Sequence, residues 1–266
     1  NCIPWVVACR EHGATLRSVP VLPDGQLDLE RLDGMLSTRT KVVALPHVSN
    51  VLGTVNPVAD ISERVHRVGA LLVVDGAQAP AHIPIDVQAL GCDCYACSGH
   101  KMLGPTGTGL LYVRRSLVDG WPPYQCGGEM AVRVGLDRVE YAEAPWRFEA
   151  GTPNIAGVIG LGAAIEKVNG LDREGAGAHE EQLRAAAIEA LRAVSGIRLG
   201  PAPAHAAPIL TFTMGGIHPH DICQLLDDQG VALRAGNHCA EPLHRALGRD
   251  ATVRASFLFY NTIEEV

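Results

Sequence analysis

The feature that most limits the fold of this 266-residue chain is the alternation of short β-rich runs with amphipathic stretches in its first part. Four runs predict strands: KVVALPH (41–47), LLVVD (71–75), CDCYAC (92–97) and GLLYVRR (109–115). The apolar spacing at about 59–68, closed by Gly69, predicts a helix. Strands that alternate with helices form a parallel or mostly parallel sheet covered by helices, so we expect an α/β fold.

The second half of the sequence has a different organisation. Residues 116–153 are rich in Gly, Pro and aromatic side chains, and we expect irregular structure there. Helices are predicted near 154–169 and 173–195. Strand, helix, strand, loop and strand then follow over 208–260, which is typical of a smaller α+β domain.

We expect a large domain over 1–171 and a small C-terminal domain over 172–266. The sequence opens on Asn1 without an initiator methionine, and its last segment, NTIEEV, places Thr262 ahead of two glutamates, as at the start of a helix. We therefore expect the N-terminal part of the large domain and the C-terminal end of the small domain to lie outside this sequence.

Composition narrows the class of function. The formal net charge is -7, which argues against a nucleic-acid surface, since such a surface needs clustered Lys and Arg. No apolar run approaches the roughly 20 residues that cross a bilayer, so no membrane contact is expected. The eight cysteines are scattered along a long chain, which favours free thiols and a cytoplasmic location.

Three of the predicted strands end next to polar residues. His47 and Asn50 lie at the end of the first, Asp75 and Gln78 at the end of the second, and Ser98 to Lys101 after the third. Ligands of open α/β sheets bind outside the carboxyl ends of the strands, so these side chains are predicted to converge.

A lysine placed between a strand and a glycine-rich loop suits covalent carbonyl chemistry. In a fairly dry pocket the Lys101 amine would lose pKa and could form a Schiff base with pyridoxal 5'-phosphate. Asp75 could keep the pyridine nitrogen protonated. Ser98 and His100 could donate to the phosphate, and Gln78 lies one turn beyond Asp75.

Two other interpretations of the same stretch fail on spacing. In GPTGTG the lysine precedes the glycines, unlike a Walker loop. Cys92, Cys94 and Cys97 have no second paired cluster nearby, and strand alternation predicts Cys92 and Cys94 on one face and Cys97 on the other. We therefore predict no metal site.

Six segments taken together resemble a known family: HVSNVLGT, VDGAQA, SGHKMLGPTGTG, APWRFEAGTPN, RAGNHCAEPL and RASFLFYNT. Over essentially the whole chain the sequence resembles a cysteine desulfurase of the class V aminotransferase superfamily. The short cysteine loop is similar to that of the second group, which supplies sulfur for iron-sulfur cluster assembly. The resemblance implies a fold-type-I pyridoxal-phosphate homodimer with a large domain and a smaller C-terminal α+β domain.

The resemblance also implies roles for single residues in cofactor binding. Lys101 matches the lysine that binds the cofactor covalently, and Asp75 matches the partner of the pyridine nitrogen. Gln78 and Asn50 match groups near the cofactor ring and substrate. The predicted phosphate ligands are Ser98, His100 and, from the neighbouring subunit, Thr152.

For the substrate, Arg254 matches the arginine that binds the carboxylate, and Arg234 and Asn50 are predicted beside it. Cys239 matches the nucleophile that takes sulfur from L-cysteine as a persulfide and leaves L-alanine. Arg234 and His238 would favour its thiolate.

Other functions stay open at this stage. L-selenocysteine could replace L-cysteine, and the sulfur acceptor is a separate protein. An aminotransferase, a selenocysteine lyase or a kynureninase-like lyase would keep Lys101 and Asp75, and a non-catalytic subunit could keep the fold alone. A histidine that stacks on the cofactor ring and a Gly-Thr phosphate turn normally precede the position of Asn1 in the family, so both are expected outside this sequence.

Overall fold

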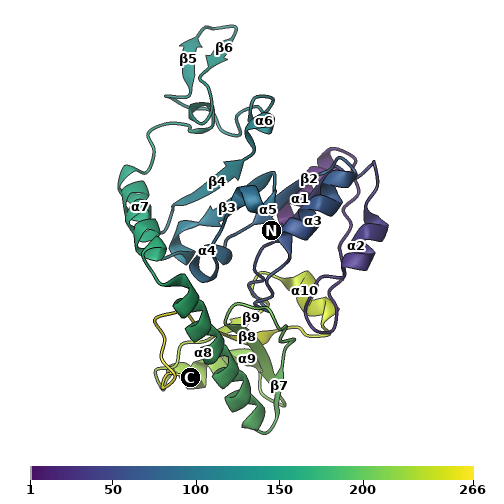
Figure 1. Cartoon of the computed structure of the whole chain (residues 1–266), viewed down its shortest axis with the longest axis vertical. Helices are drawn as coiled ribbons and strands as arrows, with labels where there is room; N and C mark the ends of the chain where they lie inside the picture. Colours follow the sequence, from purple (N-terminus) through teal and green to yellow (C-terminus); the bar gives the residue numbers. More distant parts are fainter. Residues whose placement is uncertain (1) are drawn as a thin grey trace.

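The computed structural model describes residues 2–266, which form three β-sheets and the helices around them (Figure 1). The strands are β1 (Val42–Pro46), β2 (Leu71–Asp75), β3 (Cys94–Ser98), β4 (Gly109–Val113), β5 (Ala131–Val134), β6 (Val139–Tyr141), β7 (Ile197–Leu199), β8 (Ile209–Met214), β9 (Arg234–Gly236) and β10 (Thr252–Ser256). The helices are α1 (Cys2–Glu11), α2 (Leu29–Met35), α3 (Val58–Arg67), α4 (Ala79–His82), α5 (Val87–Leu90), α6 (Arg115–Val118), α7 (Ile155–Asn169), α8 (Arg173–Ala193), α9 (Pro219–Asp227) and α10 (Glu241–Ala246), with 3₁₀ turns η1 (Gly99–Lys101) and η2 (Trp146–Phe148).

The first sheet has the order β1-β2-β3-β4, with β1, β2 and β3 parallel and β4 antiparallel at the edge. Its four strands were predicted from the sequence to within two residues at each end, and the mostly parallel arrangement is confirmed. Pro46 pairs with Asp75, and Asp75 pairs with Ala96. The carboxyl ends of the three parallel strands therefore lie side by side.

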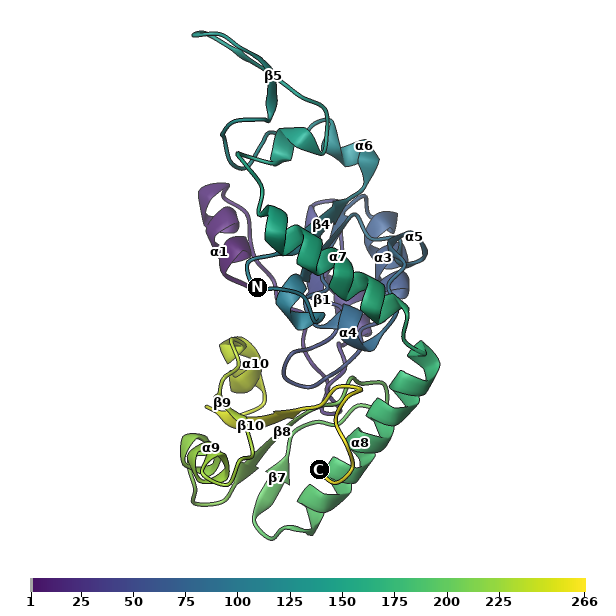
Figure 2. The ribbon, with the colours of Figure 1, turned by 90° about the vertical axis from the view of Figure 1, so that its left-hand side faces the viewer.

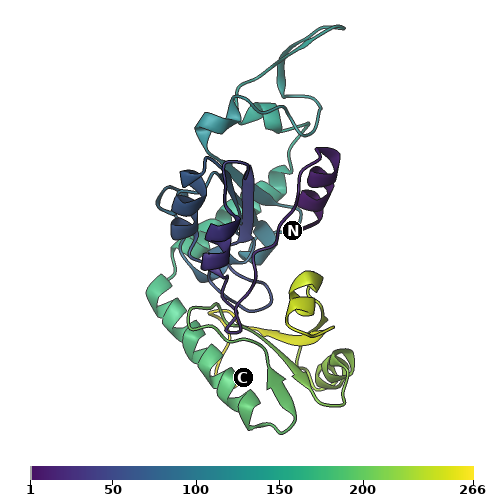
Figure 3. The ribbon, with the colours of Figure 1, turned by 90° about the vertical axis from the view of Figure 1, so that its right-hand side faces the viewer.

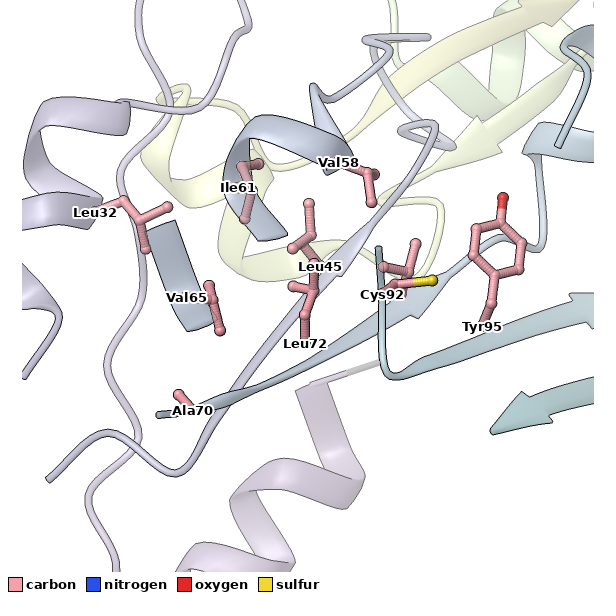
Figure 4. Close-up of a cluster of buried hydrophobic side chains, with 10 residues drawn as sticks. Leu32, Leu45, Val58, Ile61, Val65, Ala70, Leu72, Cys92 and Tyr95 are labelled. Carbon is pink, nitrogen blue, oxygen red and sulfur yellow. The ribbon is translucent and has the colours of Figure 1, made fainter. Parts of the chain in front are cut away.

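A helix covers one face of this sheet because its apolar residues recur with helical spacing. Val58, Ile61 and Val65 of α3 are buried against Leu45 and Leu72 of the strands (Figure 4). Spacings of three and four residues place the three side chains on one stripe of the helix. Burial of these side chains fixes where the chain re-enters the sheet at β2.

A close approach of backbone to an aromatic ring shapes the strand ends. A Cβ at Gly76 would overlap the ring of Tyr95, so only glycine fits directly after Asp75. The Tyr95 hydroxyl lies 2.8 Å from Nδ1 of His47, and the His47 amide donates to the carbonyl of Asp75 at 2.8 Å. Two hydrogen bonds of the buried His47 thus connect β1 with β2 and β3.

The second sheet has the order β7-β8-β10-β9 and is antiparallel throughout. Helices α7 and α8 follow each other from the first sheet to the second, and α8 runs along the second sheet (Figure 2). Asn154 and Asp172 cap the two helices by accepting hydrogen bonds from backbone amides of their first turns. The predicted helices at 154–169 and 173–195 are confirmed, and the predicted domain boundary at 171/172 falls between them and stays a prediction.

The loop after β1 docks onto the second sheet. Its residue Thr54 forms a β-bridge with Ala206, and the Ala207 amide donates to the carbonyl of Gly53 at 2.9 Å. A Cβ at Gly53 would overlap the Ala207 carbonyl oxygen, and its φ of +69° also favours glycine. This contact sets the position of one sheet relative to the other.

Two expectations about local structure were wrong. The segment 116–153 is not wholly irregular, because β5 and β6 pair as a hairpin closed by a turn at 135–138, and this hairpin projects away from the rest of the chain (Figure 3). Strand β7 and several short helices were also missed, since elements of three or four residues carry too little periodicity to recognise.

The predicted faces of the cysteines were wrong for Cys92. Strand β3 begins only at Cys94, and Cys92 precedes it and packs in the same buried cluster as Tyr95 (Figure 4). Cys97, two residues after Tyr95 on the same strand face, packs against that cluster too. Alternation of side chains holds only within the strand, so it could not be extended back to Cys92.

At the other end of the chain, Thr262 and Glu265 form a reciprocal pair of contacts. The Thr262 amide donates to the Glu265 carboxylate at 2.9 Å, and the Glu265 amide lies 3.3 Å from the Thr262 hydroxyl. This is the capping box expected at a helix start, here around a turn. Separately, none of the helices within residues 2–266 is long and apolar enough to span a membrane.

Burial of His47 predicts a pH-dependent stability. Burial lowers the pKa of His47 to about 4, whereas the unfolded side chain titrates near 6.5. Between these values the unfolded chain binds a proton that the folded chain does not, so stability is lost as the pH falls. We expect about 2 kcal/mol of unfolding free energy to be lost through His47 between about pH 7 and about pH 5.

Urea denaturation at the two pH values tests this. The pH-dependent loss should be smaller in His47→Gln than in the parent protein, and His12→Gln, at an exposed histidine, should keep the parent's loss. An equal loss in the parent and His47→Gln would contradict the assignment.

Candidate active site

The site lies where the three parallel strands end. Asp75 is the last residue of β2, between Pro46 and Ala96 of the neighbouring strands, and its Oδ1 accepts a hydrogen bond from the Ala77 amide at 2.9 Å. The carboxylate is therefore held at the turn that leads to Gln78. The sequence predicted this location, because Asp75 ends a predicted strand.

The glycine-rich loop holds Lys101 at the end of β3. Lys101 closes the short turn η1, and the amides of Met102 and Gly104 both donate to the carbonyl of Gly99. The Gly99 amide in turn donates to the carbonyl of Thr108 at 2.9 Å, which folds the loop back on itself. The loop thus presents Lys101 at the carboxyl edge of the sheet.

Lys101 is exposed in the described chain, as is His100 beside it. The dry surroundings expected around the amine are therefore not supplied by residues 2–266.

A cavity of about 330 Å³ joins the two sheets at this edge. It brings together four of the predicted site residues: Gln78, His100, Lys101 and Arg254. Its other lining residues come from α4, the glycine loop, the second sheet and the segment after β10: His82, Leu103, Ile209, Ser256, Phe257, Leu258 and Tyr260. The combination of an amine, a guanidinium and amide groups is suited to a small anionic molecule.

Arg254 reaches this cavity from β10. Its Nη1 donates to the backbone carbonyl of Asn50 at 3.0 Å, and its Nε is buried without a hydrogen-bond partner within residues 2–266. Burial and the nearby charge of Arg234 lower the pKa of Arg254. An unpartnered buried donor on a cation favours binding of an anionic oxygen.

Cys239 lies in the loop between β9 and α10 and is exposed. The Nη2 atom of Arg234 lies 4.0 Å from its sulfur, so the predicted pairing of these two residues is observed. The side-chain amide of Asn50 donates to the carbonyl of His238 at 2.7 Å. Asn50 thereby links the cysteine loop to Arg254 and the cavity.

Not every predicted residue lines the cavity. Asp75 and Ser98 lie behind it at the strand ends, and Asn50 lies between it and the cysteine loop. Thr152 is exposed in the segment before α7. The structure therefore brings one group of predicted residues into the cavity and holds Cys239 and Arg234 in an adjacent loop.

Sequence reasoning missed the pair formed by His82 and Glu180. Each side chain is 6% exposed, Nδ1 of His82 lies 2.8 Å from Oε2 of Glu180, and His82 lines the cavity. The four-residue spacing from Gln78 to His82 could have suggested that both side chains share a face. Glu180 lies 98 residues further along the chain, and no local pattern could have identified it.

Within residues 2–266 no group of three or more His, Cys, Asp or Glu residues could hold a metal ion. Burial raises the pKa of Cys94 and of Cys97 to about 11, and it also raises that of Cys92. Thiols in this state are protonated at neutral pH and serve as apolar packing.

A larger hollow of about 530 Å³ lies between α8 and residues 202–204. It contains none of the predicted site residues and is lined by two glutamates and two arginines, Glu181, Glu189, Arg184 and Arg192. Size alone does not mark a site, and the smaller cavity has the convergent reactive groups.

Comparison with known proteins agrees with this geometry. The family model of the class-V aminotransferases matches residues 1–266. A probable cysteine desulfurase of Halalkalibacterium halodurans and a cysteine desulfurase of Enterobacter sp. are each 47% identical over the whole chain. The chain spans 65% and 66%, respectively, of the lengths of these relatives.

Solved structures of cysteine desulfurases have the same fold as this chain. The cysteine desulfurase CsdA from Escherichia coli, in its S-sulfonic acid form, superposes with a TM-score of 0.95 at 39% identity, over 100% of this chain and 66% of that one. Apo cysteine desulfurase from Thermococcus onnurineus superposes with a TM-score of 0.92 at 36% identity, over 99% and 66%. The fold-type-I architecture predicted from the sequence is confirmed, and the family uses pyridoxal phosphate. The chain belongs to the class-V aminotransferase family.

Proposed function

We propose that this protein is a pyridoxal-phosphate-dependent cysteine desulfurase that converts L-cysteine to L-alanine and carries the sulfur on Cys239. The observation that supports this most is that one residue, Asn50, connects the loop of Cys239 with the cavity that contains Lys101. Asn50 contacts both the cysteine loop and Arg254, which lines the cavity that contains Lys101. A transaminase or a lyase of the same family would need the cavity and would have no use for the adjacent thiol.

The donor set fits pyridoxal phosphate. Lys101 would bind it covalently, and Asp75 would hold a proton on the ring nitrogen. Ser98, His100 and, from a second copy, Thr152 would hold the phosphate, with Gln78 and Asn50 near the ring. When bound, the cofactor withdraws electrons from the α-carbon of the substrate.

Lys101 would also move protons. Its amine, once released from the cofactor, is proposed to take the α-proton of the substrate as general base. Arg254, with Arg234 and Asn50 beside it, would bind the substrate carboxylate through charge-assisted hydrogen bonds. These contacts would orient the substrate so that its sulfur faces the cysteine loop.

Cys239 would then accept the sulfur. Its thiolate attacks the substrate sulfur, a sulfur–sulfur bond forms, and the bond between that sulfur and the β-carbon breaks. The electron pair of the broken bond stays with the substrate, and protonation of the substrate carbons then gives L-alanine. Arg234, 4.0 Å from the Cys239 sulfur, would stabilise the thiolate.

The biological setting is also a proposal. We infer a cytoplasmic homodimer that passes sulfur to an acceptor protein of iron-sulfur assembly, with L-selenocysteine as a second substrate. Exposed apolar side chains on α7, next to Thr152, support burial against a second copy: Ile155, Val158 and Ile159. We also propose that the chain divides into a large domain over 1–171 and a small domain over 172–266.

The first test locates the cofactor. The chain has three lysines, Lys41, Lys101 and Lys167. After loading with pyridoxal phosphate and borohydride reduction, peptide mass spectrometry should find the cofactor on Lys101 alone. Lys101→Ala should lose the label, Lys167→Ala should keep it, and a label on Lys41 or Lys167 would refute the mechanism.

The second test separates a desulfurase from other members of the family. Cys239→Ala should bind cofactor as the parent does and lose persulfide formation and sulfur release from L-cysteine. The control is Cys126→Ala, at another exposed cysteine, which should keep both. Sulfur release that survives in Cys239→Ala would exclude Cys239 as the sulfur carrier.

The third test concerns the substrate carboxylate. Removing a charged hydrogen-bond partner costs about 1.5–3 kcal/mol, so Arg254→Ala should raise KM for L-cysteine about 10- to 100-fold. Arg245→Ala, at an exposed arginine on α10, is the control and should leave KM unchanged. An unchanged KM in Arg254→Ala would place the carboxylate elsewhere.

A further inference from the structure

Three buried polar residues lie next to Cys239 and take part in none of the steps proposed above. One of them is His238, which was expected to favour the Cys239 thiolate, but burial lowers its pKa to about 4 and so disfavours the cation that this role needs. His238 and His244 each place Nε2 near the hydroxyl of Thr252, at 3.0 Å and 3.1 Å. All three side chains are at most 2% exposed. Buried polar groups are costly unless every donor is satisfied, so the proton positions in this cluster are constrained.

The positions of the ring protons follow from the atoms that each ring nitrogen contacts. Nδ1 of His244 lies 3.1 Å from the carbonyl of Ala240, which can only accept, so Nδ1 of His244 carries a proton. With its proton on Nδ1, the ring of His244 presents a lone pair on Nε2 toward the Thr252 hydroxyl. The Thr252 hydroxyl has one proton and donates it to that lone pair.

The Thr252 oxygen is then left to accept from Nε2–H of His238. Neutral His238 must therefore have a bare Nδ1, and this atom is the one that is buried without a partner in the described chain. The reverse assignment would bury an N–H donor without an acceptor. Burial, with smaller effects of Arg254, His244 and Arg234, lowers the pKa of His238 to about 4, which agrees with a neutral ring.

The backbone at His238 and Cys239 is in an unusual conformation. Both residues have positive φ, +51° and +60°, which non-glycine residues adopt only where neighbours hold them. Asn50 holds the carbonyl of His238, and the side chain of Asn237 accepts from the Cys239 amide at 3.2 Å. The ring of His238 has its one hydrogen bond to Thr252.

We propose that Thr252 is a positioning residue for Cys239: its hydroxyl fixes the tautomer of His238 and thereby holds the left-handed His238–Cys239 pair that presents the thiol. This inference rests on the proposed function, in which Cys239 carries sulfur. It goes further because it assigns a role to residues that touch neither substrate nor cofactor.

A neutral His238 also matters for charge. The groups that face it are His244, Arg234 and Arg254, and a third cation there would repel both arginines. Keeping His238 neutral leaves the two guanidinium groups as the cations beside the thiol. In the tautomer set by Thr252, the ring proton of His238 is on Nε2, and the unpartnered Nδ1 carries no proton.

The direct test reads the tautomers in the holoenzyme. In long-range ¹H–¹⁵N spectra of histidine-labelled protein, assigned with His238→Gln and His244→Gln, His238 should be the Nε2–H tautomer and His244 the Nδ1–H tautomer. Two rings of the same tautomer, or a protonated His238 at neutral pH, would overturn the proposal.

The second measurement is the alkylation rate of Cys239 by iodoacetamide, resolved by peptide mass spectrometry from about pH 6 to about pH 9. Thr252→Val keeps the shape and removes the hydroxyl, and it should change this rate about tenfold, as expected when one buried hydrogen bond is lost. Thr252→Ser should restore the parent profile. Ser62→Ala in α3, which removes a buried hydroxyl that donates to the carbonyl of Gly91, should leave the profile unchanged.

Alkylation is measured without substrate, so it tests the positioning of Cys239 whether or not the protein transfers sulfur. Loss of sulfur transfer is tested separately with Cys239→Ala. An alkylation profile of Thr252→Val equal to that of the parent would overturn the proposal, and if this variant does not fold, the tautomers of the parent protein still decide.

Discussion

The arrangement of the candidate site depends on the contacts of Asn50. Its carbonyl accepts from Arg254 at 3.0 Å, and its side-chain amide donates to the carbonyl of His238 at 2.7 Å. These partners are 204 and 188 residues away in the sequence; Arg254 is in strand β10 of the second sheet, and His238 is in the loop that follows β9. The loop that contains Asn50 is itself held by Gly53, which packs against Ala207 too closely for any side chain. One loop therefore fixes the distance between the two sheets and the geometry between them.

The two sheets supply different groups of the candidate site. In the first sheet Asp75 ends β2 and Lys101 follows β3, at the carboxyl edge outside which ligands of open α/β sheets bind. The antiparallel sheet supplies Arg254 and the loop of Cys239. Because the cavity forms only where the two meet, a shift of one sheet would separate the amine from the guanidinium without unfolding either.

Burial favours the neutral form of two histidines, His47 and His238. It lowers the pKa of each to about 4, and each ring has one nitrogen within hydrogen-bond distance of a hydroxyl, from Tyr95 and Thr252 respectively. The charged groups at the site are then arginine, lysine and aspartate side chains. Neutral histidine serves here as a rigid hydrogen-bonding element that positions the backbone next to reactive side chains.

The sequence by itself determined the four strands of the first sheet, the helices α3, α7 and α8, and the residues placed after each strand, because periodicity and glycines act locally. The family resemblance supplied the roles proposed for Cys239, Arg254 and Thr152. Only the tertiary structure decided that Cys92 packs with Tyr95, that Lys101 is exposed, and that His82 meets Glu180. These outcomes depend on contacts between residues far apart in the chain, whose free energy is set by packing and burial, and no local pattern encodes them.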